Sequence, residues 1–453
     1  MKNQETQRHG RVVVLVPAPF QGHMTPMLQL GTILHSRGFS IVVAHTEFNS
    51  PNPLNHPEFI FLPISDNLTA HETSFKNPLD SLLAINNNCK APLQENLAQM
   101  VEKKAPNEQV SCIIYDSLMY FSEAVASHLN LPSILFRASC ALNLLAYHDI
   151  LRLHAEGQLP FQDSKAQDLV PGLYPLRFKD LPLPGFGTSE DSVKLIQLLS
   201  NFTTSSALIC NTVDNLEHSA VSKLQQHYQV PFFSIGPLHK LASASSTSFL
   251  KEDTNCIEWL DKQAPRSVIY VSFGSLTIMN KTDLTEMAWG LANSGQPFLW
   301  VIRPGSVHGS ELTELLPEGF EEKVGERGCT VKWAPQKEVL AHGAVGGFWS
   351  HCGWNSTLES ISEGVPMICK PYFVDQKVNA RYLSYIWNVG LELENDSERG
   401  DIERAIRRLM VDKEGDEMRQ RAIDMKDKIE ACVQKGSSSY SSLNNLQEFI
   451  LSF

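Results

Sequence analysis

Short runs of consecutive apolar residues recur along the whole chain, and helical patterns separate most of them. A continuous apolar run of strand length is typical of a parallel strand, because helices bury both faces of such a sheet. The repeated order of strand, helix and strand predicts doubly wound α/β structure. The runs are RVVVLVP, SRGFSIVVAHT, VSCIIYD and LPSILFRAS in the first half, and RSVIYVSFGS, PFLWVIRPG, GCTVKWAP, AVGGFWSHCG, VPMICKPYF and VGLELE in the second.

Length and one change in composition predict two domains. A chain of 453 residues is too long for one ordinary core. Residues 237–254 are rich in Ser and Ala without a sustained period, and we interpret them as a surface loop or linker. We expect one α/β domain over residues 1–236 and another from residue 255, with a cleft between them.

The composition argues against several classes of function. The net charge is −12 and no segment is rich in Lys and Arg, so nucleic-acid binding is not expected. No window reaches the roughly 18 apolar residues of a membrane span, and the apolar run after the polar start MKNQETQRHGR has the length of a strand, so we do not expect it to be the h-region of a signal peptide. The nine cysteines are scattered without a CxxC pair, which indicates reduced thiols in the cytoplasm and gives no weight to the sequons at Asn67 and Asn201.

His23 is the first candidate for a functional side chain. In open α/β sheets, ligands bind beyond the carboxyl ends of the strands, and His23 lies just past the first one. We expect a helix from about Thr25 to His35, with Thr25 as its N-cap, Pro26 in its first turn and a sharp turn at Gly22. The imidazole would then point into the cleft. The alternative is a histidine that only packs or caps.

Asp116 ends the strand VSCIIYD. Because the ends of neighbouring parallel strands lie close together, its carboxylate could hold the His23 ring and leave the other ring nitrogen to remove a proton. The alternative is an N-cap of the next helix.

The segment GGFWSHCGWNSTLES indicates an anion site. A strand is expected to end near Ser350, Gly353 makes a turn, and a helix opens at Asn355 and Ser356, whose backbone N–H groups attract a phosphate. His351 could add a donor, and VSFGS, ending at Ser275, is a second turn of this kind. The chain has no GxGxxG, no P-loop and no DxD pair, so backbone amides, His and Ser would have to neutralise the anion.

Five further residues in the second half suit a base, a ribose and a sugar. Trp333 could stack on a base whose edge Gln336 reads, although an isolated Trp more often anchors a core. Glu359 could accept hydrogen bonds from ribose hydroxyls. Asp375 and Gln376, at the end of a strand-like stretch, suit the vicinal hydroxyls of a sugar, with a loop cap as the alternative.

Taken together, these positions resemble the plant family-1 UDP-glycosyltransferases. Residues 333–376, WAPQKEVLAHGAVGGFWSHCGWNSTLESISEGVPMICKPYFVDQ, are similar to the secondary-product signature of that family, from its initial Trp to its final Asp-Gln. A weaker similarity covers most of the chain, including GHMTPMLQL and VSFGS. The resemblance implies a GT-B fold of two Rossmann-like domains with the active site between them.

The resemblance also implies roles for individual residues. His23 would be the general base and Asp116 its partner. The residues implied to bind the UDP-sugar are Ser275, Trp333, Ala334, Gln336, His351, Trp354, Asn355, Ser356, Glu359, Asp375 and Gln376.

The implied reaction is transfer of glucose from UDP-glucose, with inversion, to a hydroxyl, carboxyl or amine of a small plant metabolite or hormone. No metal and no cofactor are expected, and the protein is expected to be a monomer. The last segment resembles a terminal helix that crosses back to the first domain, which sets expected bounds of 255–435 for the second domain and 436–453 for the crossing. GHMTPMLQL, KPYFVDQKVNARY and ERGDIERAIRRLMVD are similar to the branch that includes the steviol-glycoside, cytokinin and benzoxazinone glucosyltransferases.

The acceptor pocket is expected to be mostly apolar. Arg137 could meet an acceptor carboxylate or form a salt bridge, and residues 372–374 depart from the FADQ-like ending that is common in the family. The expected pocket residues are Phe20, Leu118, Met119, Ala138, Asn143, Tyr147, Phe373 and Val374.

Two other functions stay open at this point. One is a related GT-B enzyme such as a nucleotide-sugar epimerase, and the other is a catalytically silent protein that binds UDP-sugars.

Overall fold

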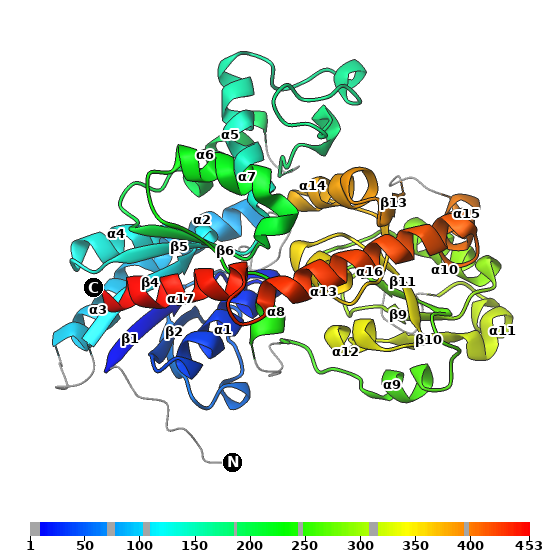
Figure 1. Ribbon diagram of the computed structural model, residues 1–453, viewed down its shortest axis with the longest axis horizontal. Coiled ribbons are helices and arrows are strands. Elements are labelled where there is room, and N and C mark those ends of the chain that lie inside the picture. The colour runs from blue at the N-terminus through cyan, green and yellow to red at the C-terminus, as the bar shows by residue number, and fades with distance from the viewer. Residues whose placement is uncertain are drawn as a thin grey trace. The chain divides into compact units, whose positions relative to one another are not determined.

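The computed structural model describes residues 10–69, 78–102, 109–184, 188–242, 248–307, 316–393 and 398–453. The chain forms two compact units, and each is built on a parallel sheet of its own (Figure 1). Unit 1 comprises residues 1–160, 184–249 and 431–453, and unit 2 comprises residues 161–183 and 250–430.

The sheet of unit 1 has seven strands in the order β3-β2-β1-β4-β5-β6-β7, and every pairing is parallel. The chain moves outwards from β1 to β3 and then returns to β4 on the other side of β1, so β1 and β4 flank a topological switch point. The strands are β1 (Arg11–Val16), β2 (Ser40–Thr46), β3 (Ile60–Ile64), β4 (Gln109–Asp116), β5 (Ser133–Arg137), β6 (Ala207–Cys210) and β7 (Phe232–Ser234).

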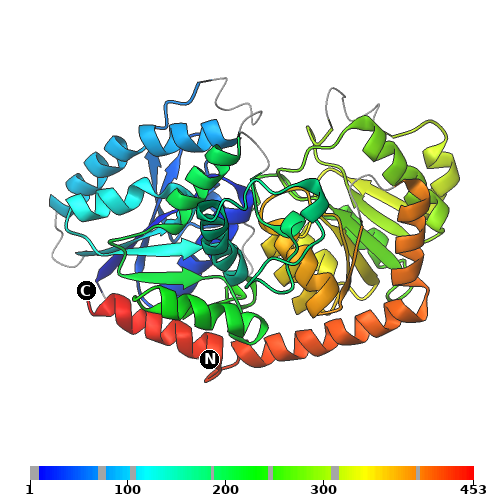
Figure 2. The same ribbon diagram turned by 90° about the horizontal axis from the view of Figure 1, so that it is seen from above.

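Helices cover both faces of this sheet, as Figure 2 shows. They are α1 (Gln21–Ser36), α2 (Pro78–Asn88), α3 (Lys90–Glu102), α4 (Phe121–His128), α5 (Ala141–Ala155), α6 (Ser189–Ser200), α7 (Asp214–His227), α8 (Leu238–Leu241) and α17 (Ser438–Leu451). A short 3₁₀ helix, η2 (Ser117–Met119), follows β4 directly.

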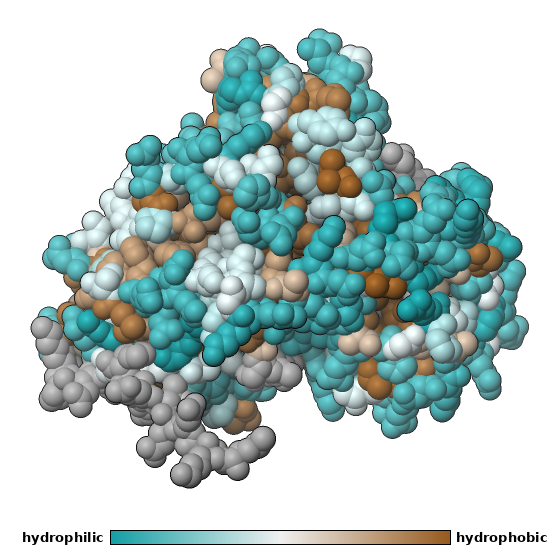
Figure 3. All heavy atoms as spheres, in the orientation of Figure 1, coloured by the Kyte–Doolittle hydropathy of each residue, from teal (hydrophilic) through white to brown (hydrophobic). Residues whose placement is uncertain are grey.

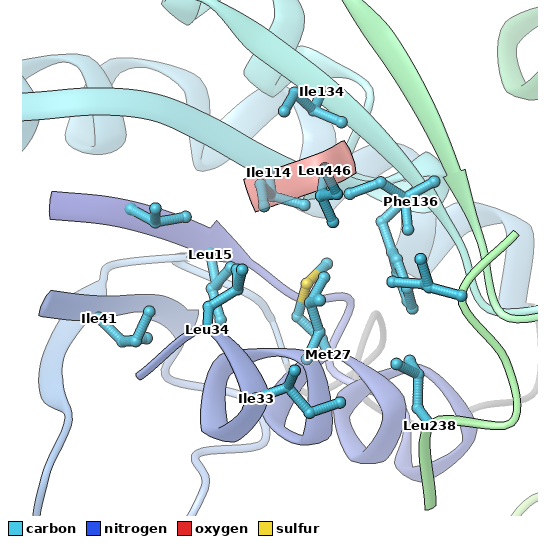
Figure 4. Packing of buried hydrophobic residues seen from close by; sticks show 14 of the residues in the cluster. Leu15, Met27, Ile33, Leu34, Ile41, Ile114, Ile134, Phe136, Leu238 and Leu446 are labelled. Atoms are coloured by element: carbon cyan, nitrogen blue, oxygen red, sulfur yellow. The ribbon is translucent and has the colours of Figure 1, made fainter. Parts of the chain in front are cut away.

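The core of unit 1 lies between the sheet and the helices α1, α8 and α17 (Figure 4). Leu15, Ile114 and Phe136 point from the strands towards Met27 of α1 and Leu446 of α17, and all five are nearly inaccessible to solvent. Burial of each such side chain contributes about 1.5–3 kcal/mol. This core holds the carboxyl ends of β1 and β4 in a fixed register.

Unit 2 repeats the topology with six strands. The order β10-β9-β8-β11-β12-β13 is again parallel throughout, and its switch point lies between β8 and β11. The strands are β8 (Val268–Ser272), β9 (Phe298–Val301), β10 (Gly328–Val331), β11 (Val345–Ser350), β12 (Met367–Cys369) and β13 (Gly390–Glu392). The helices are α9 (Asn255–Leu260), α10 (Lys281–Ser294), α11 (Phe320–Val324), α12 (Gln336–Ala341), α13 (Trp354–Ser362), α14 (Asp375–Arg381), α15 (Arg399–Met410) and α16 (Lys413–Val433), the last of which runs into unit 1.

The predicted α/β class is confirmed, and each apolar run quoted above contains a strand. The sequence patterns do not predict β3, β6 and β7. β3 lies at the sheet edge, is partly exposed and contains Pro63, while β6 and β7 have only four and three residues.

The expected surface loop at 237–254 begins instead with a short helix, α8, whose first residue is buried. Leu238 is fully buried and packs in the same core as α1, so the Ser- and Ala-rich composition does not indicate exposure there. Compact unit 1 accordingly extends to Phe249.

Hydrophilic side chains cover most of the face shown in Figure 3, and hydrophobic residues lie there in small groups. No helix of the described residues combines the length and the apolar character that a membrane span requires.

Candidate active site

The two topological switch points hold most of the candidate residues. In unit 1, His23 follows β1 and Asp116 is the last residue of β4, and these two strands flank the switch point. In unit 2, Ser275 and His351 follow β8 and β11 in the same way. Each unit therefore presents its polar candidates where an open parallel sheet binds ligands.

His23 lies in the first turn of α1, which starts earlier than the sequence predicts. The helix begins at Gln21, so Gly22 is helical, Pro26 is inside the helix, and Thr25 is not the N-cap. No side chain caps this end. The Gln21 side chain holds the turn instead: its amide nitrogen donates to Thr25 Oγ1 at 2.7 Å, and its oxygen accepts from the Phe249 backbone N–H at 2.8 Å.

Asp116 faces His23 directly. His23 Nδ1 lies 2.8 Å from Asp116 Oδ2, and the two side chains are 29% and 0% exposed. Oδ1 of Asp116 accepts the Leu118 backbone N–H at 2.9 Å and so caps η2. Both interpretations of Asp116 therefore apply to one carboxylate. A carboxylate at Nδ1 favours the tautomer with its proton there, which leaves the Nε2 lone pair as the basic site.

Unit 2 holds the His351 ring between two glycines. A Cβ at Gly274 would lie 2.7 Å from His351 Cε1 and Nε2, and one at Gly353 would lie 2.5 Å from Nε2. Burial lowers the pKa of His351 to about 4, and a hydrogen bond to the Ser272 backbone opposes this only in part. The imidazole is therefore neutral at pH 7, so it can contribute a hydrogen bond to an anion but no charge.

The N-terminus of α13 follows His351 directly. Gly353 is its N-cap and no side chain caps it, and Trp354, Asn355 and Ser356 form the first turn. A helix N-terminus presents backbone N–H groups and a positive dipole end, which together favour an anion. The predicted helix start at Asn355 differs from the observed one by a single residue.

A hydrogen-bonded network joins α12 to α13. Gln336 Nε2 donates to Glu359 Oε2 at 2.7 Å and to Ser356 Oγ at 3.0 Å, while Tyr270 donates to Gln336 Oε1 at 3.3 Å. Burial raises the pKa of Glu359, and the hydrogen bond from Gln336 acts in the opposite direction. Trp333, just before α12, is partly exposed, whereas Ala334 is buried.

Asp375 and Gln376 begin α14 rather than end a strand, since β12 already ends at Cys369. Gln376 Oε1 accepts the backbone N–H groups of Tyr372 and Phe373 at 2.9 and 3.2 Å. Val374 has a φ of 50°, which turns the chain into the helix. The side chain of Gln376 therefore fixes the loop that precedes α14.

The expected acceptor residues of unit 1 follow the carboxyl ends of β1, β4 and β5. Phe20 contacts the His23 ring edge-on, with 6.2 Å between the ring centroids. Leu118 is partly exposed, Met119 and Ala138 are buried, and Asn143 and Tyr147 are buried on α5. Phe373 and Val374 lie in unit 2 and are partly exposed.

Arg137 is buried without forming the expected salt bridge. Its guanidinium lies 5.3 Å from the centre of the Tyr147 ring and donates to Leu199 O at 3.4 Å and Ser139 Oγ at 3.3 Å. Within the described residues, no carboxylate forms an ion pair with it.

The comparisons with known proteins decide the family. Residues 244–428 match the family model described as UDP-glucoronosyl and UDP-glucosyl transferase. The chain is 54% identical over 441 residues to UDP-glycosyltransferase 76E1 of Solanum lycopersicum, an alignment that covers 97% of this chain and 92% of that protein. The chain belongs to the plant family-1 UDP-glycosyltransferases.

This UDP-glycosyltransferase is also 49% identical over 448 residues to flavonol 3-O-glucosyltransferase UGT76E12 of Arabidopsis thaliana, with 97% of each chain covered. Phytolacca americana UGT2 complexed with UDP-2fluoro-glucose and pterostilbene has a similar structure, with a TM-score of 0.82, 28% identity, and coverage of 97% of this chain and 100% of that one. The predicted family, the enzyme class and the GT-B fold are confirmed. The comparisons give no support to an epimerase or a silent binder.

The geometry adds residues to the candidate site of the glycosyltransferase that the sequence patterns missed. Gly274 packs against His351. Asn379 donates to Cys352 O at 2.9 Å and to Asp375 Oδ2 at 3.2 Å, so it joins the loop after β11 to α14. Its spacing of four residues from Asp375 on one helix face was the available signal. Among the described residues, no group of three or more His, Cys, Asp and Glu side chains is placed to hold a metal ion.

Proposed function

We propose that this enzyme transfers glucose from UDP-glucose to a hydroxyl, carboxyl or amine of a small plant metabolite, with inversion at the anomeric carbon. One observation carries the proposal: the basic His23 and the buried Asp116 lie 2.8 Å apart at the switch point of unit 1. A base in this arrangement removes the acceptor proton as the acceptor attacks, and general-base catalysis typically contributes about a hundred- to ten-thousand-fold.

The donor site belongs to unit 2. Trp333 would stack on uracil, the Ala334 and Gln336 region would read its edge, and Glu359 would accept the ribose hydroxyls. The diphosphate would bind at the N-terminus of α13, with Ser275, His351, Asn355 and Ser356 as additional donors. Trp354, Asp375 and Gln376 would contact the hexose. Because His351 is neutral, backbone amides and the helix dipole would stabilise the charge that develops on the leaving UDP.

The acceptor is proposed to be mostly apolar, because most of the residues proposed to contact it are apolar: Phe20, Leu118, Met119 and Ala138 in unit 1, and Phe373 and Val374 in unit 2. The names of two similar proteins, a flavonol glucosyltransferase and an enzyme complexed with pterostilbene, make phenols the first acceptors to test. A hydroxyl-bearing terpenoid or a hormone is the next class.

We further propose that the enzyme works as a monomer in the cytoplasm without a metal or cofactor. All nine cysteines are free, and all but Cys329 are buried, which fits a reducing compartment. EDTA should leave the rate of transfer unchanged within about two-fold, because backbone amides and His351 are proposed to stabilise the diphosphate and neither needs a cation.

The decisive experiment incubates the purified enzyme with UDP-glucose and a panel of phenols, terpenoid alcohols and acids, and detects added hexose by mass spectrometry. We expect His23→Ala to lower kcat by about a hundred-fold or more. His128→Ala, which changes an exposed histidine of unit 1, is the matched control and should be unaffected.

Three results would contradict the proposal. Transfer that survives in His23→Ala would remove the base from the mechanism. Tight UDP-glucose binding without transfer or UDP release, across the whole panel, would contradict the proposed acceptor classes. An α-configured product would contradict inversion.

A further inference from the structure

A segment of the first half of the chain belongs to unit 2. Residues 161–183, here called the strap, group with unit 2, although the chain on either side of them belongs to unit 1. The strap contains two short 3₁₀ helices, η3 (Asp163–Lys165) and η4 (Phe178–Asp180), and η4 packs against α14.

Arg177 ties the strap to itself and to the sheet of unit 2. Its guanidinium donates to both oxygens of Asp180, at 2.7 and 2.8 Å, and to both oxygens of Glu392, at 2.8 and 2.9 Å. Glu392 is the last residue of β13. Burial acts to lower the pKa of Arg177. The hydrogen bonds and charges of Asp180 and Glu392 outweigh this effect and raise the pKa. The guanidinium is thus saturated on both sides by carboxylates.

The strap also contacts the face of α14 that carries Lys377 and Arg381, residues one helical turn apart. Arg381 Nε donates to Pro175 O at 3.0 Å and lies 3.8 Å from Asp180 Oδ2. Burial lowers the pKa of Lys377, and the charge of Asp180 acts in the opposite direction. Asp180, only 5% exposed, is therefore the anion shared by Arg177 of the strap and two cations of α14.

The opposite end of the same helix carries Asp375 and Gln376. α14 has seven residues and is about 10 Å long, so Arg381 and Asp375 lie at opposite ends of one short, stiff element. Asn379, between these ends, bonds both Asp375 and the loop after β11. Among the described residues, no hydrogen bond or ion pair joins the strap to Trp333, Gln336 or Glu359, which lie on or before α12 and on α13.

We propose that Asp180 and Arg177 of the strap are positioning residues for donor-sugar recognition, and that they act through α14 on Asp375 and Gln376. This inference rests on the proposed function, in which Asp375 and Gln376 contact the hexose. The strap holds the cationic face of α14, and the helix then presents its first residues at a fixed angle. The proposed uridine and diphosphate contacts come from residues outside α14, with Asn379 as the one bond from α14 to the loop after β11, so we expect the strap to affect them less than the hexose contacts.

The test compares the dissociation constants of UDP-glucose, which carries the hexose, and UDP, which lacks it. Asp180→Asn keeps the shape of the side chain but removes the negative charge that faces Arg381 and Lys377, while Arg177 keeps its ion pair with Glu392. We expect it to raise the Kd and KM for UDP-glucose about ten-fold, equivalent to about 1.4 kcal/mol, while the Kd for UDP, measured by calorimetry, changes less than about two-fold. Arg381→Gln should reproduce this pattern. The double variant should lose little more than the larger single one, because the two residues act through one contact.

Glu286→Gln is the matched control. Glu286 pairs with Arg399 in the same unit, between α10 and α15, and its loss should lower the thermal midpoint without changing the ratio of the two dissociation constants. Asp180→Glu retains the charge and should restore most of the wild-type ratio. A merely structural role would lower the thermal midpoint and weaken UDP and UDP-glucose alike.

Equal weakening of both ligands, or an unchanged ratio in well-folded Asp180→Asn and Arg381→Gln, would overturn the proposal. The binding ratio needs no acceptor and no turnover. Failure of the strap inference is therefore distinguishable from failure of the transferase reaction, which the wild-type enzyme and His23→Ala test separately.

Discussion

Gly274 and Gly353 determine where the His351 ring lies. Gly274 has a φ of 71°, in the region that favours glycine, and its missing side chain leaves the space that the imidazole fills. Ser275 follows directly, so one glycine sets the course of the loop after β8 and the position of a ring that comes from β11. The loops after β8 and β11 thus meet at the contact between Gly274 and the His351 ring, and a side chain at position 274 would disrupt that contact.

We predict that Gly274→Ala weakens UDP binding by about ten-fold or more, since a new Cβ only 2.7 Å from His351 must displace the ring. Calorimetry with UDP measures the effect. Gly295→Ala is the control, because Gly295 has a φ of 73° and a Cβ there meets no atom within 4 Å. It imposes the same backbone strain, so it should lower stability and leave UDP affinity unchanged. Equal affinity in both variants would show that His351 does not bind the donor.

For single residues, the sequence predicts candidate functional side chains near strand ends. It misses the residues that hold those side chains in place. His23, Asp116 and His351 could be found because each lies at or shortly after the end of an apolar run. Gly274 could not, because its role depends on a ring 77 positions away in the chain. Asp375 was found, but Asn379, which holds it, has the pattern of any polar residue on a helix.

At the scale of single elements, a buried carboxylate fixes the start of α5. Glu217 lies at a kink in α7 and accepts the backbone N–H groups of Ala141 and Leu142 at 3.0 and 2.9 Å, and it also accepts the hydroxyl of Thr212. Burial raises the pKa of Glu217, and these hydrogen bonds act in the opposite direction. The helix that carries Asn143 and Tyr147 is thereby anchored at its first turn.

We predict that Glu217→Gln lowers the free energy of unfolding by about 1–3 kcal/mol, because an amide nitrogen cannot accept and leaves one buried N–H without its partner. Urea unfolding measures the change. Glu190→Gln, in the exposed first turn of α6, is the control and should stay within about 0.5 kcal/mol. A neutral outcome for Glu217→Gln would mean that the cap contributes nothing.

Helix boundaries were the least predictable element feature. Proline suits the first turn of a helix, so Pro26 and Thr25 indicate a start at Thr25, yet α1 begins at Gln21. The earlier start is held by the bond from Phe249 to the Gln21 side chain, a contact over 228 positions. By contrast, the pattern of residues 281–294, KTDLTEMAWGLANS, predicts a helix with the bounds that α10 has, and Asn280 caps that helix locally by accepting the Asp283 N–H.

At the scale of the whole molecule, the chain passes between the units four times, after residues 160, 183, 249 and 430. The first two passages enclose the strap and have no signal in composition. Ion pairs of Arg177, Arg381 and Glu392 hold the strap in unit 2. In the sequence these charged residues cannot be distinguished from ordinary surface residues. The two-domain organisation was therefore predictable, whereas the assignment of this segment was not.

The acid stability of the fold depends on a histidine away from the proposed chemistry. His148 Nε2 lies 2.7 Å from the Tyr228 hydroxyl, and its ring centre lies 4.1 Å from that of His227. Burial, His227 and Arg137 lower the pKa of His148 from 6.5 to about 4. In that interval the unfolded chain binds a proton that the folded chain does not, so stability falls as the pH drops from about 6.5 to about 4 and is fully present above it.

We predict that His148→Phe makes stability less dependent on pH, since phenylalanine keeps a ring in the same place and has no site for the proton. At pH 8 the variant should be less stable by about 1 kcal/mol, because the hydrogen bond to Tyr228 is lost. As the pH approaches 4.5 this deficit should shrink or reverse. Urea unfolding at a series of pH values checks it, with His128→Phe on the surface of α4 as a control that should follow the wild type in parallel. A deficit that stays constant from pH 8 to pH 4.5 would mean that His148 titrates alike in the folded and unfolded chains.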